Sequence, residues 1–174
     1  NQYTTEVKFD GTKLFICPMN AKGDHREFLY DGLKDNDLLK SGHVSARWRG
    51  VYLDEQGSAT SETLPQNNFV ESIIPFYEDS FCSVVTESEF DSWNVRFTEK
   101  FYFPIMYNRP FMILGAPKLI SWIKEYGFKT FPELFDEGYD DEVDLRERTK
   151  LIVKNLKRLQ DKSKKELQDL LEIV

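Results

Sequence analysis

Two short polar groups in the chain have residue types that could bind an anionic or hydroxylated ligand. His25 and Arg26 follow a predicted strand and its loop, while Glu99 and Lys100 lie inside a run of aromatic residues. An arginine in the first turn of a helix can donate two hydrogen bonds to a phosphate or carboxylate, beside unpaired backbone N–H groups. The alternative is a surface arginine whose stem covers apolar neighbours. The spacing alone leaves both interpretations open.

Glu99 and Lys100 are expected to open a helix with Thr98 as its N-cap. A glutamate in the first turn of a helix stabilises the helix dipole without any ligand, which is the simpler interpretation. Pro104 lies inside the same helical stretch and should kink or delay it, so that the polar ends of the first turn converge. The pair therefore has a structural and a binding interpretation.

Strands and helices alternate along the chain, and this order predicts the fold that must position these residues. We expect strands over 13–17, 80–88 and 110–115, a second strand or an extended stretch over 43–53, and a last short strand or turn over 128–131. A short helix is expected over 25–39, with Asp24 as N-cap and fraying near Gly32. Further helices are expected after the N-cap Thr98, over 116–127 with Gly127 at the end, from Val143 onward, and after a Ser163–Glu166 capping box. Segment 54–68 reads as a long polar loop.

This pattern predicts an α/β protein with a single Rossmann-like domain, whose open, mainly parallel sheet is flanked by helices. We expect residues 1–141 to form the Rossmann-like domain and residues 142–174 to form C-terminal helices packed on the same domain. In such sheets ligands bind beyond the carboxyl ends of the strands, at the point where the strand order reverses.

Charge and cysteine content argue against several kinds of partner. Residues 132–147 hold eight acidic residues and one arginine, so this segment alone accounts for the net charge of −7 and the rest of the chain is neutral. A basic surface for duplex nucleic acid is therefore not expected, and the aromatic residues have core-like spacing, which disfavours single strands. No apolar run reaches the ~20 residues of a membrane span. Cys17 and Cys82 read as buried core residues, which favours a reducing, cytoplasmic setting.

Two acidic segments have the composition of a metal site. Asp35-Asn36-Asp37 matches an acid-x-acid pattern at a helix end, and 136–144 is rich in carboxylates. Oxygen-ligand sites need several converging groups, so we interpret the first as a helix end and the second as a solvated loop before a helix.

The stretches CPMNAKGDHREFLYDGL and RFTEKFYFPIMYNRPFMILGAP together resemble the donor-binding half of GT-B glycosyltransferases of the α-1,3-fucosyltransferase type. The matching positions are Asn20, Arg26, Phe28, Tyr30, Asp31 and Leu33 in the first stretch, and Phe97, Thr98, Glu99, Lys100, Gly115, Ala116 and Pro117 in the second. The resemblance covers residues 13–131, and the second motif is also similar to one in uncharacterised phage and marine proteins.

This resemblance implies a site for a nucleoside diphosphate sugar. Arg26 and Lys100 would neutralise the pyrophosphate, and Glu99 would accept hydrogen bonds from the ribose hydroxyls, with no essential metal or other cofactor. The remaining expected site residues are Asn20, His25, Thr98 and, with an ambiguous alignment, Glu87. In the family the acceptor site and the catalytic base usually belong to the N-terminal domain, and for this sequence we expect that half to be missing, supplied in trans or never present, so no catalytic residue is assigned. The alternative is a non-catalytic interaction or assembly module, of phage or environmental origin, that keeps the fold.

Overall fold

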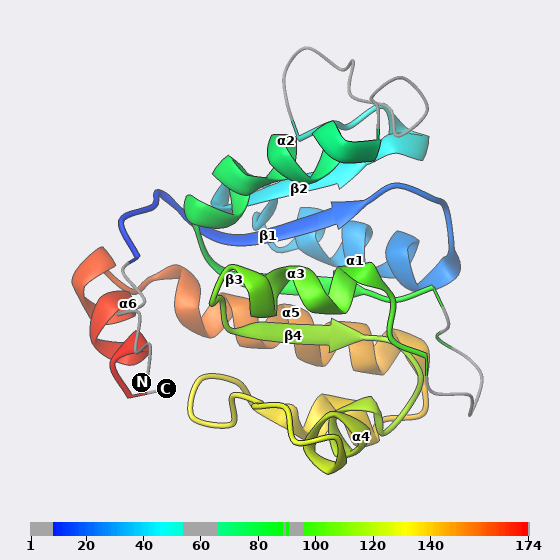
Figure 1. The fold of residues 1–174 in the computed structure, drawn as a ribbon. Helices are drawn as coiled ribbons and strands as arrows, with labels where there is room; N and C mark the ends of the chain where they lie inside the picture. The colour runs from blue at the N-terminus through cyan, green and yellow to red at the C-terminus, as the bar shows by residue number, and fades with distance from the viewer. Residues whose placement is uncertain (1–8, 54–65, 89, 91–95, 174) are drawn as a thin grey trace.

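The computed structural model describes residues 9–53, 66–88, 90 and 96–173, and side chains from Ser72 onward in the second of these ranges. Its centre is a sheet of four parallel strands in the order β2-β1-β3-β4 (Figure 1). The strands are β1 (Lys13–Met19), β2 (Gly42–Ala46), β3 (Ser80–Thr86) and β4 (Phe111–Leu114). Every residue of β3 and β4 is buried, as expected where helices cover both faces of a parallel sheet. The predicted α/β fold with an open parallel sheet is confirmed.

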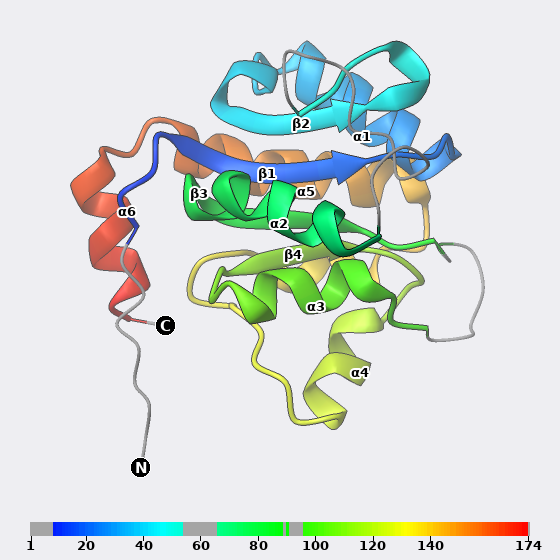
Figure 2. The ribbon, with the colours of Figure 1, turned by 45° about the horizontal axis from the view of Figure 1, so that its top comes forward.

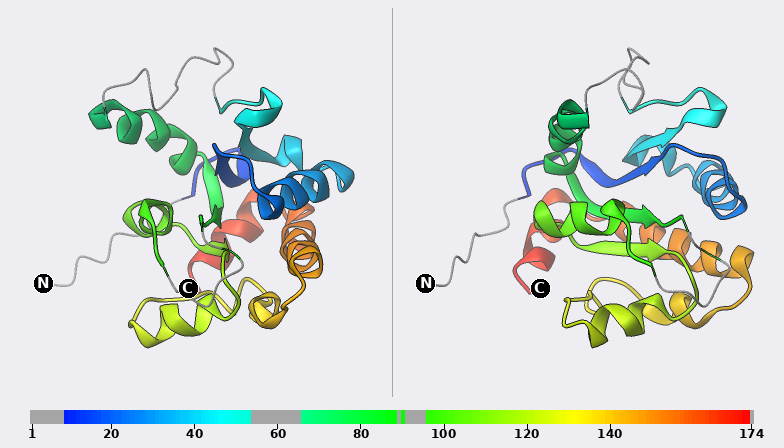
Figure 3. Two further views of the ribbon diagram at one scale, coloured as in Figure 1. Left: turned by 90° about the vertical axis from the view of Figure 1, so that its right-hand side faces the viewer. Right: turned by 45° about the vertical axis from the view of Figure 1, so that its right-hand side comes forward.

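Helices lie on both faces of this sheet. The α-helices are α1 (Asp24–Asp35), α2 (Gln66–Glu78), α3 (Glu99–Met106), α4 (Leu119–Glu125), α5 (Leu145–Gln160) and α6 (Lys164–Leu171). Short 3-10 helices, η1 (Leu39–Ser41), η2 (Arg47–Arg49) and η3 (Glu137–Asp141), complete the fold. Helices α2 and α3 cover one face, and α1 and α5 lie together on the other (Figures 1 and 3).

The two C-terminal helices contribute to the same hydrophobic core as the sheet. Ile152 and Leu156 of α5 are fully buried in that core, where α5 packs against α1 and β1. Helix α6 lies near the amino ends of the strands (Figure 2), and Leu167 and Leu171 are buried there. Its Ser163 capping box is present as predicted.

Several local predictions were wrong, among them the end of the first helix, which is Asp35 and not Leu39. The second strand ends at Ala46, because η2 follows and Gly50, at φ 71°, turns the chain back so that Val51 pairs with Ala46. Residues 128–131 form no strand. The N-cap of α1 is Gly23, not Asp24, because the backbone of Gly23 is extended and Asp24 is already helical. A Cβ at position 23 would lie 2.9 Å from Cε1 of the His25 ring.

Other expected features are confirmed or lie outside the described residues, except that residues 66–68, predicted as loop, belong to α2. Gly127, at φ 80°, ends α4 as predicted, with Phe128 N–H bonded to the carbonyl of Ile123. Cys17 and Cys82 are buried and free. Of the predicted loop 54–68, residues 54–65 lie outside the described part, and α2 begins at Gln66. Within the described residues, none of the helices has the length and apolar character needed to cross a membrane.

Candidate functional site

The strand order reverses between β1 and β3. From β1 the chain continues to β2 on one side, then returns to form β3 on the other side of β1. Helix α1 begins five residues after β1 ends, and the segment leading to α3 leaves the carboxyl end of the neighbouring β3. This is the position at which open parallel sheets bind ligands. Most of the predicted site residues lie here.

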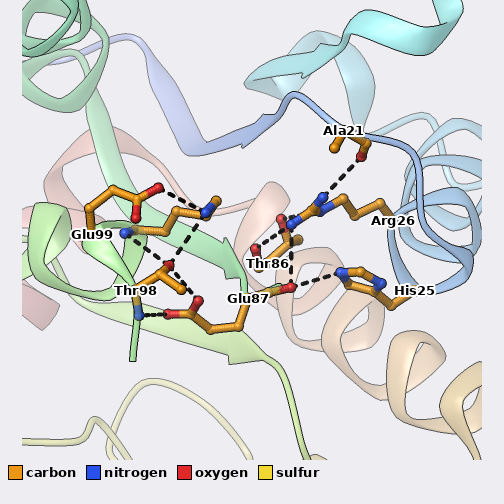
Figure 4. A network of polar contacts seen from close by, with 8 residues as sticks. Ala21, His25, Arg26, Thr86, Glu87, Thr98 and Glu99 are labelled. Atoms are coloured by element: carbon orange, nitrogen blue, oxygen red, sulfur yellow. Dashed lines mark hydrogen bonds and ion pairs between the residues drawn. The ribbon is translucent and has the colours of Figure 1, made fainter. Parts of the chain in front are cut away.

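Arg26 spans this reversal point from α1 to the end of β3 (Figure 4). The side chain is 5% exposed, and its Nη2 donates to the carbonyls of Thr86 at 3.2 Å and Glu87 at 3.3 Å. Its Nε donates to Oγ1 of Thr86 at 3.2 Å, and its Nη1 donates to the carbonyl of Ala21 at 3.0 Å. Four of its five N–H groups therefore bind the protein, and within the described residues it forms no ion pair.

His25 is buried beside Arg26 and is neutral at pH 7. Burial lowers its pKa to about 4, and the charge of Arg26 acts in the same direction, while the hydrogen bond to Glu87 opposes it. Its Nε2 lies 2.9 Å from the carbonyl oxygen of Glu87, which can only accept, so Nε2 carries the proton. The ring stacks on Phe90 with 4.1 Å between centroids. Nδ1 is then a buried acceptor without a hydrogen-bond partner among the described residues, and it lies 3.1 Å from where a Cβ on Gly23 would stand.

Glu87 connects the two sequence motifs. Its carbonyl accepts the bonds from His25 and Arg26, while its fully buried carboxylate accepts bonds from Thr98 (Figure 4). Oε1 receives the peptide N–H of Thr98 at 3.1 Å, and Oε2 receives the Thr98 hydroxyl at 2.5 Å. We call His25, Arg26, Thr86, Glu87 and Thr98 the switch-point network. The sequence left the position of Glu87 open, and the structure places it at the centre of this network.

Glu99 and Lys100 form the solvent-facing part of the site. Thr98 is the N-cap of α3 as predicted, with its hydroxyl oxygen 3.4 Å from the peptide N of Lys100. Nζ of Lys100 lies 2.9 Å from Oε1 of Glu99, whose side chain is 67% exposed. Burial opposes ionisation of Glu99, but the hydrogen bonds from Lys100 and from its own peptide N–H outweigh it and lower its pKa. The carboxylate of Glu99 and the ammonium group of Lys100 can therefore both contact a ligand at the carboxyl ends of the strands.

The amino end of α1 supplies further donors. Within the described residues, the peptide N–H groups of Asp24 and His25 make no hydrogen bond, and Gly23 provides no capping side chain. Such a helix end carries a partial positive charge and is suited to an anion. Asn20 is exposed directly after β1, and the structure gives it no hydrogen bond to the other described residues of the site. Six of the seven predicted residues are thus contiguous, and Asn20 stands apart.

Other positions of the α1 motif have packing roles. Asp31 pairs with Arg49 at 3.0 Å, and the same guanidinium lies 5.0 Å from the centroid of the Tyr30 ring. Phe28 is covered by Arg146 at 3.9 Å, and Leu33 is fully buried. These contacts stabilise the start of the domain without adding donors to the site.

The acidic segment 136–144 acts mainly in capping. Asp136 accepts from Gly138 N in η3 and Asp144 from Glu147 N in α5, while buried Asp140 accepts from the first peptide N–H groups of α4. The interpretation as a solvated loop is therefore wrong for Asp140, because its buried carboxylate caps the amino end of α4. Within the described residues, no group of three His, Cys, Asp or Glu side chains has the arrangement of a metal site.

Sequence reasoning missed Gly23, Thr86 and Phe90. Gly23 has a recognisable signal, a glycine just before a helix. Thr86 is only the last residue of a predicted strand, and Phe90 carries no signal. Comparisons of the chain with protein-family profiles, with curated proteins and with solved structures found no match.

Proposed function

We propose that the chain is a glycosyltransferase-like domain that binds a nucleoside diphosphate sugar at the carboxyl ends of β1 and β3, as the donor half of a sugar transferase. The observation that supports this most directly is the switch-point network. Two motifs more than 70 residues apart in the sequence meet through Glu87 at the reversal of strand order.

The proposal assigns ligand contacts to the exposed groups. Glu99 would accept hydrogen bonds from the two ribose hydroxyls, since a carboxylate has two acceptor oxygens. Lys100 and the free N–H groups at the amino end of α1 would bind the diphosphate, whose charge grows as the sugar leaves. Arg26 would serve as a positioning residue, because its hydrogen bonds hold the loop after β1 against the end of β3.

The test is calorimetric titration of the protein with UDP, GDP, CDP and ADP. We expect one of them to bind, and Lys100→Met to weaken that binding about tenfold, since a charge-assisted hydrogen bond is worth about 1.5 kcal/mol. Glu99→Ala should weaken binding of the nucleoside diphosphate but not of inorganic pyrophosphate. Lys165→Met, at an exposed position of α6, is the matched control and should bind normally. If none of the four nucleotides binds, the proposal is wrong.

One observation favours the alternative of a non-catalytic interaction module. Arg26, the residue expected to neutralise the pyrophosphate, already donates four N–H groups to the protein. In a module without a nucleotide, the switch-point network would serve only to stabilise the fold. The same titration separates the two functions, because the module predicts no binding of any nucleoside diphosphate.

A further inference from the structure

A cavity lies at the amino end of β4, at the opposite end of the sheet from the candidate site. Its volume is about 250 Å³, and its walls are mostly apolar. The main wall residues are Pro104, Pro110, Phe111, Phe128, Phe131 and Leu171. Because β4 is four residues long, the cavity is about 13 Å from the carboxyl end of that strand. The residues assigned to the nucleotide lie at the other end of the sheet and none of them lines this cavity, so this inference does not depend on the proposed function.

The charged residues of this cavity are both cations. Arg109 and Lys129 line it, and no acidic residue does. Lys129 is exposed, with Nζ 6.0 Å from the centroid of the Phe131 ring, and it forms no ion pair within the described residues. In a chain whose net charge is −7, two cations beside an apolar hollow without a carboxylate are an unusual local excess.

Arg109 is the stronger of the two observations, because it is only 7% exposed. Its Nε donates to the carbonyl of Tyr77 at 2.9 Å, and its Nη2 donates to the carbonyl of Glu78 at 3.1 Å. Its Nη1 makes no hydrogen bond to any described residue, and Glu78 acts on it electrostatically without forming an ion pair. A nearly buried guanidinium with three N–H groups that bind no described residue is suited to a carboxylate.

We propose that this cavity binds a small carboxylate with an aromatic or branched aliphatic body. The aromatic and proline walls would contact the body, and edge-to-face contacts are already the arrangement of Phe111 with Phe131, 5.3 Å apart. The carboxylate would lie toward Arg109 and Lys129. The volume is below the ~300 Å³ at which pockets for drug-sized ligands begin, so the body is limited to one or two rings.

The test compares three probes of one shape and different charge: indole-3-acetate, indole and tryptamine. Binding is followed by ¹H–¹⁵N NMR titration of the full chain. We expect indole-3-acetate to bind most tightly, indole more weakly and tryptamine most weakly. The shifted amides should cluster in 105–112 and 128–131. Absence of binding at millimolar concentration, equal affinity for the three probes, or shifts elsewhere in the chain would overturn the proposal.

Two variants sharpen the result. Lys129→Met removes an exposed charge that no described residue pairs with, so the fold should be unaffected. It should weaken the binding of indole-3-acetate three- to tenfold and leave the binding of indole unchanged, whereas Lys165→Met should change the binding of neither. Leu171→Trp fills the cavity and should abolish binding of all three probes. If Lys129→Met leaves the preference for the carboxylate intact, the assigned chemistry is wrong, and this result holds even if Leu171→Trp fails to fold.

Discussion

The neutral, buried His25 should make the stability of the protein fall as the pH drops below 6.5. Replacing it with glutamine tests this, because the glutamine amide can still donate to the carbonyl of Glu87 but does not titrate. In the folded protein burial, followed by the charge of Arg26, lowers the pKa of His25 from 6.5 to about 4. Above pH 6.5 the ring is neutral in both the folded and the unfolded chain, so its protonation does not change the free energy of unfolding.

Between pH 6.5 and 4 the unfolded chain takes up the proton first, and stability is lost. At about 1.4 kcal/mol for each tenfold change in proton affinity, the complete loss is about 3 kcal/mol, and about 2 kcal/mol of it appears by pH 5. Below pH 4 both states are protonated and the difference stays constant. The sign follows from the lowered pKa, since the unfolded state binds more protons throughout this window.

The assay is urea denaturation of the wild-type protein and His25→Gln at pH 7.5 and pH 5.0. Carboxylates titrate in both proteins, so the difference in unfolding free energy between the two proteins isolates the histidine. We expect the wild type to lose about 2 kcal/mol more than the variant between the two pH values. If the difference between the proteins is the same at both pH values, His25 does not titrate as the structure indicates.

Three further changes test the supports of the site, with the unfolding free energy in urea as the measurement. Thr98→Val removes the N-cap of α3 and the hydroxyl bonded to Glu87, and should destabilise by about 1–3 kcal/mol; an unchanged midpoint would contradict the network. Gly23→Ala would place a Cβ against His25 and should lower the unfolding free energy by about 1–3 kcal/mol. In the His25→Ala background the same change should have no such effect, because the contact is gone. Burial raises the pKa of Asp140 from 3.8 to about 6 against the opposing bonds from Ile120 and Leu119, so stability should fall as pH rises from 4 to 6, and Asp140→Asn should lack this fall.

The sheet could be predicted because its strands are short apolar runs separated by helical patterns. The end of β2 could not, since HVSARWRGVYL alternates through the turn as regularly as through the strand. What reverses the chain is the left-handed conformation of Gly50, which Gly adopts without strain. The N-cap of α1 was missed for a related reason. Asp24 is the better capping residue in isolation, but it already belongs to the helix, and the extended residue before it is Gly23. The residue type at position 23 is set by its neighbour, because the ring of His25 occupies the space that a side chain there would need.

For the candidate site, the sequence predicts where the residues lie along the strands and helices but not which groups they contact. The order strand, loop, helix predicts that His25 and Thr98 each lie near a carboxyl end of a strand. It does not predict that β1 and β3 are neighbours, and this adjacency alone brings the carbonyl of Glu87 to His25, 62 residues away. The partners of Arg26 are equally hidden, because three of its four bonds go to main-chain oxygens, which every residue possesses.

Arg26 is one of three buried arginines that use their guanidinium groups in this way. Arg109 binds the carbonyls at the end of α2, and Arg148 binds those of Gly115, Glu142 and Val143. In each case the arginine satisfies carbonyls where a helix or strand ends, and such groups are costly to leave unpaired when buried. The arrangement of Arg26 therefore needs no ligand to explain it. A bound diphosphate would depend on Lys100 and the amino end of α1, so its affinity should fall with added salt, because salt screens the charge of a partly exposed cation.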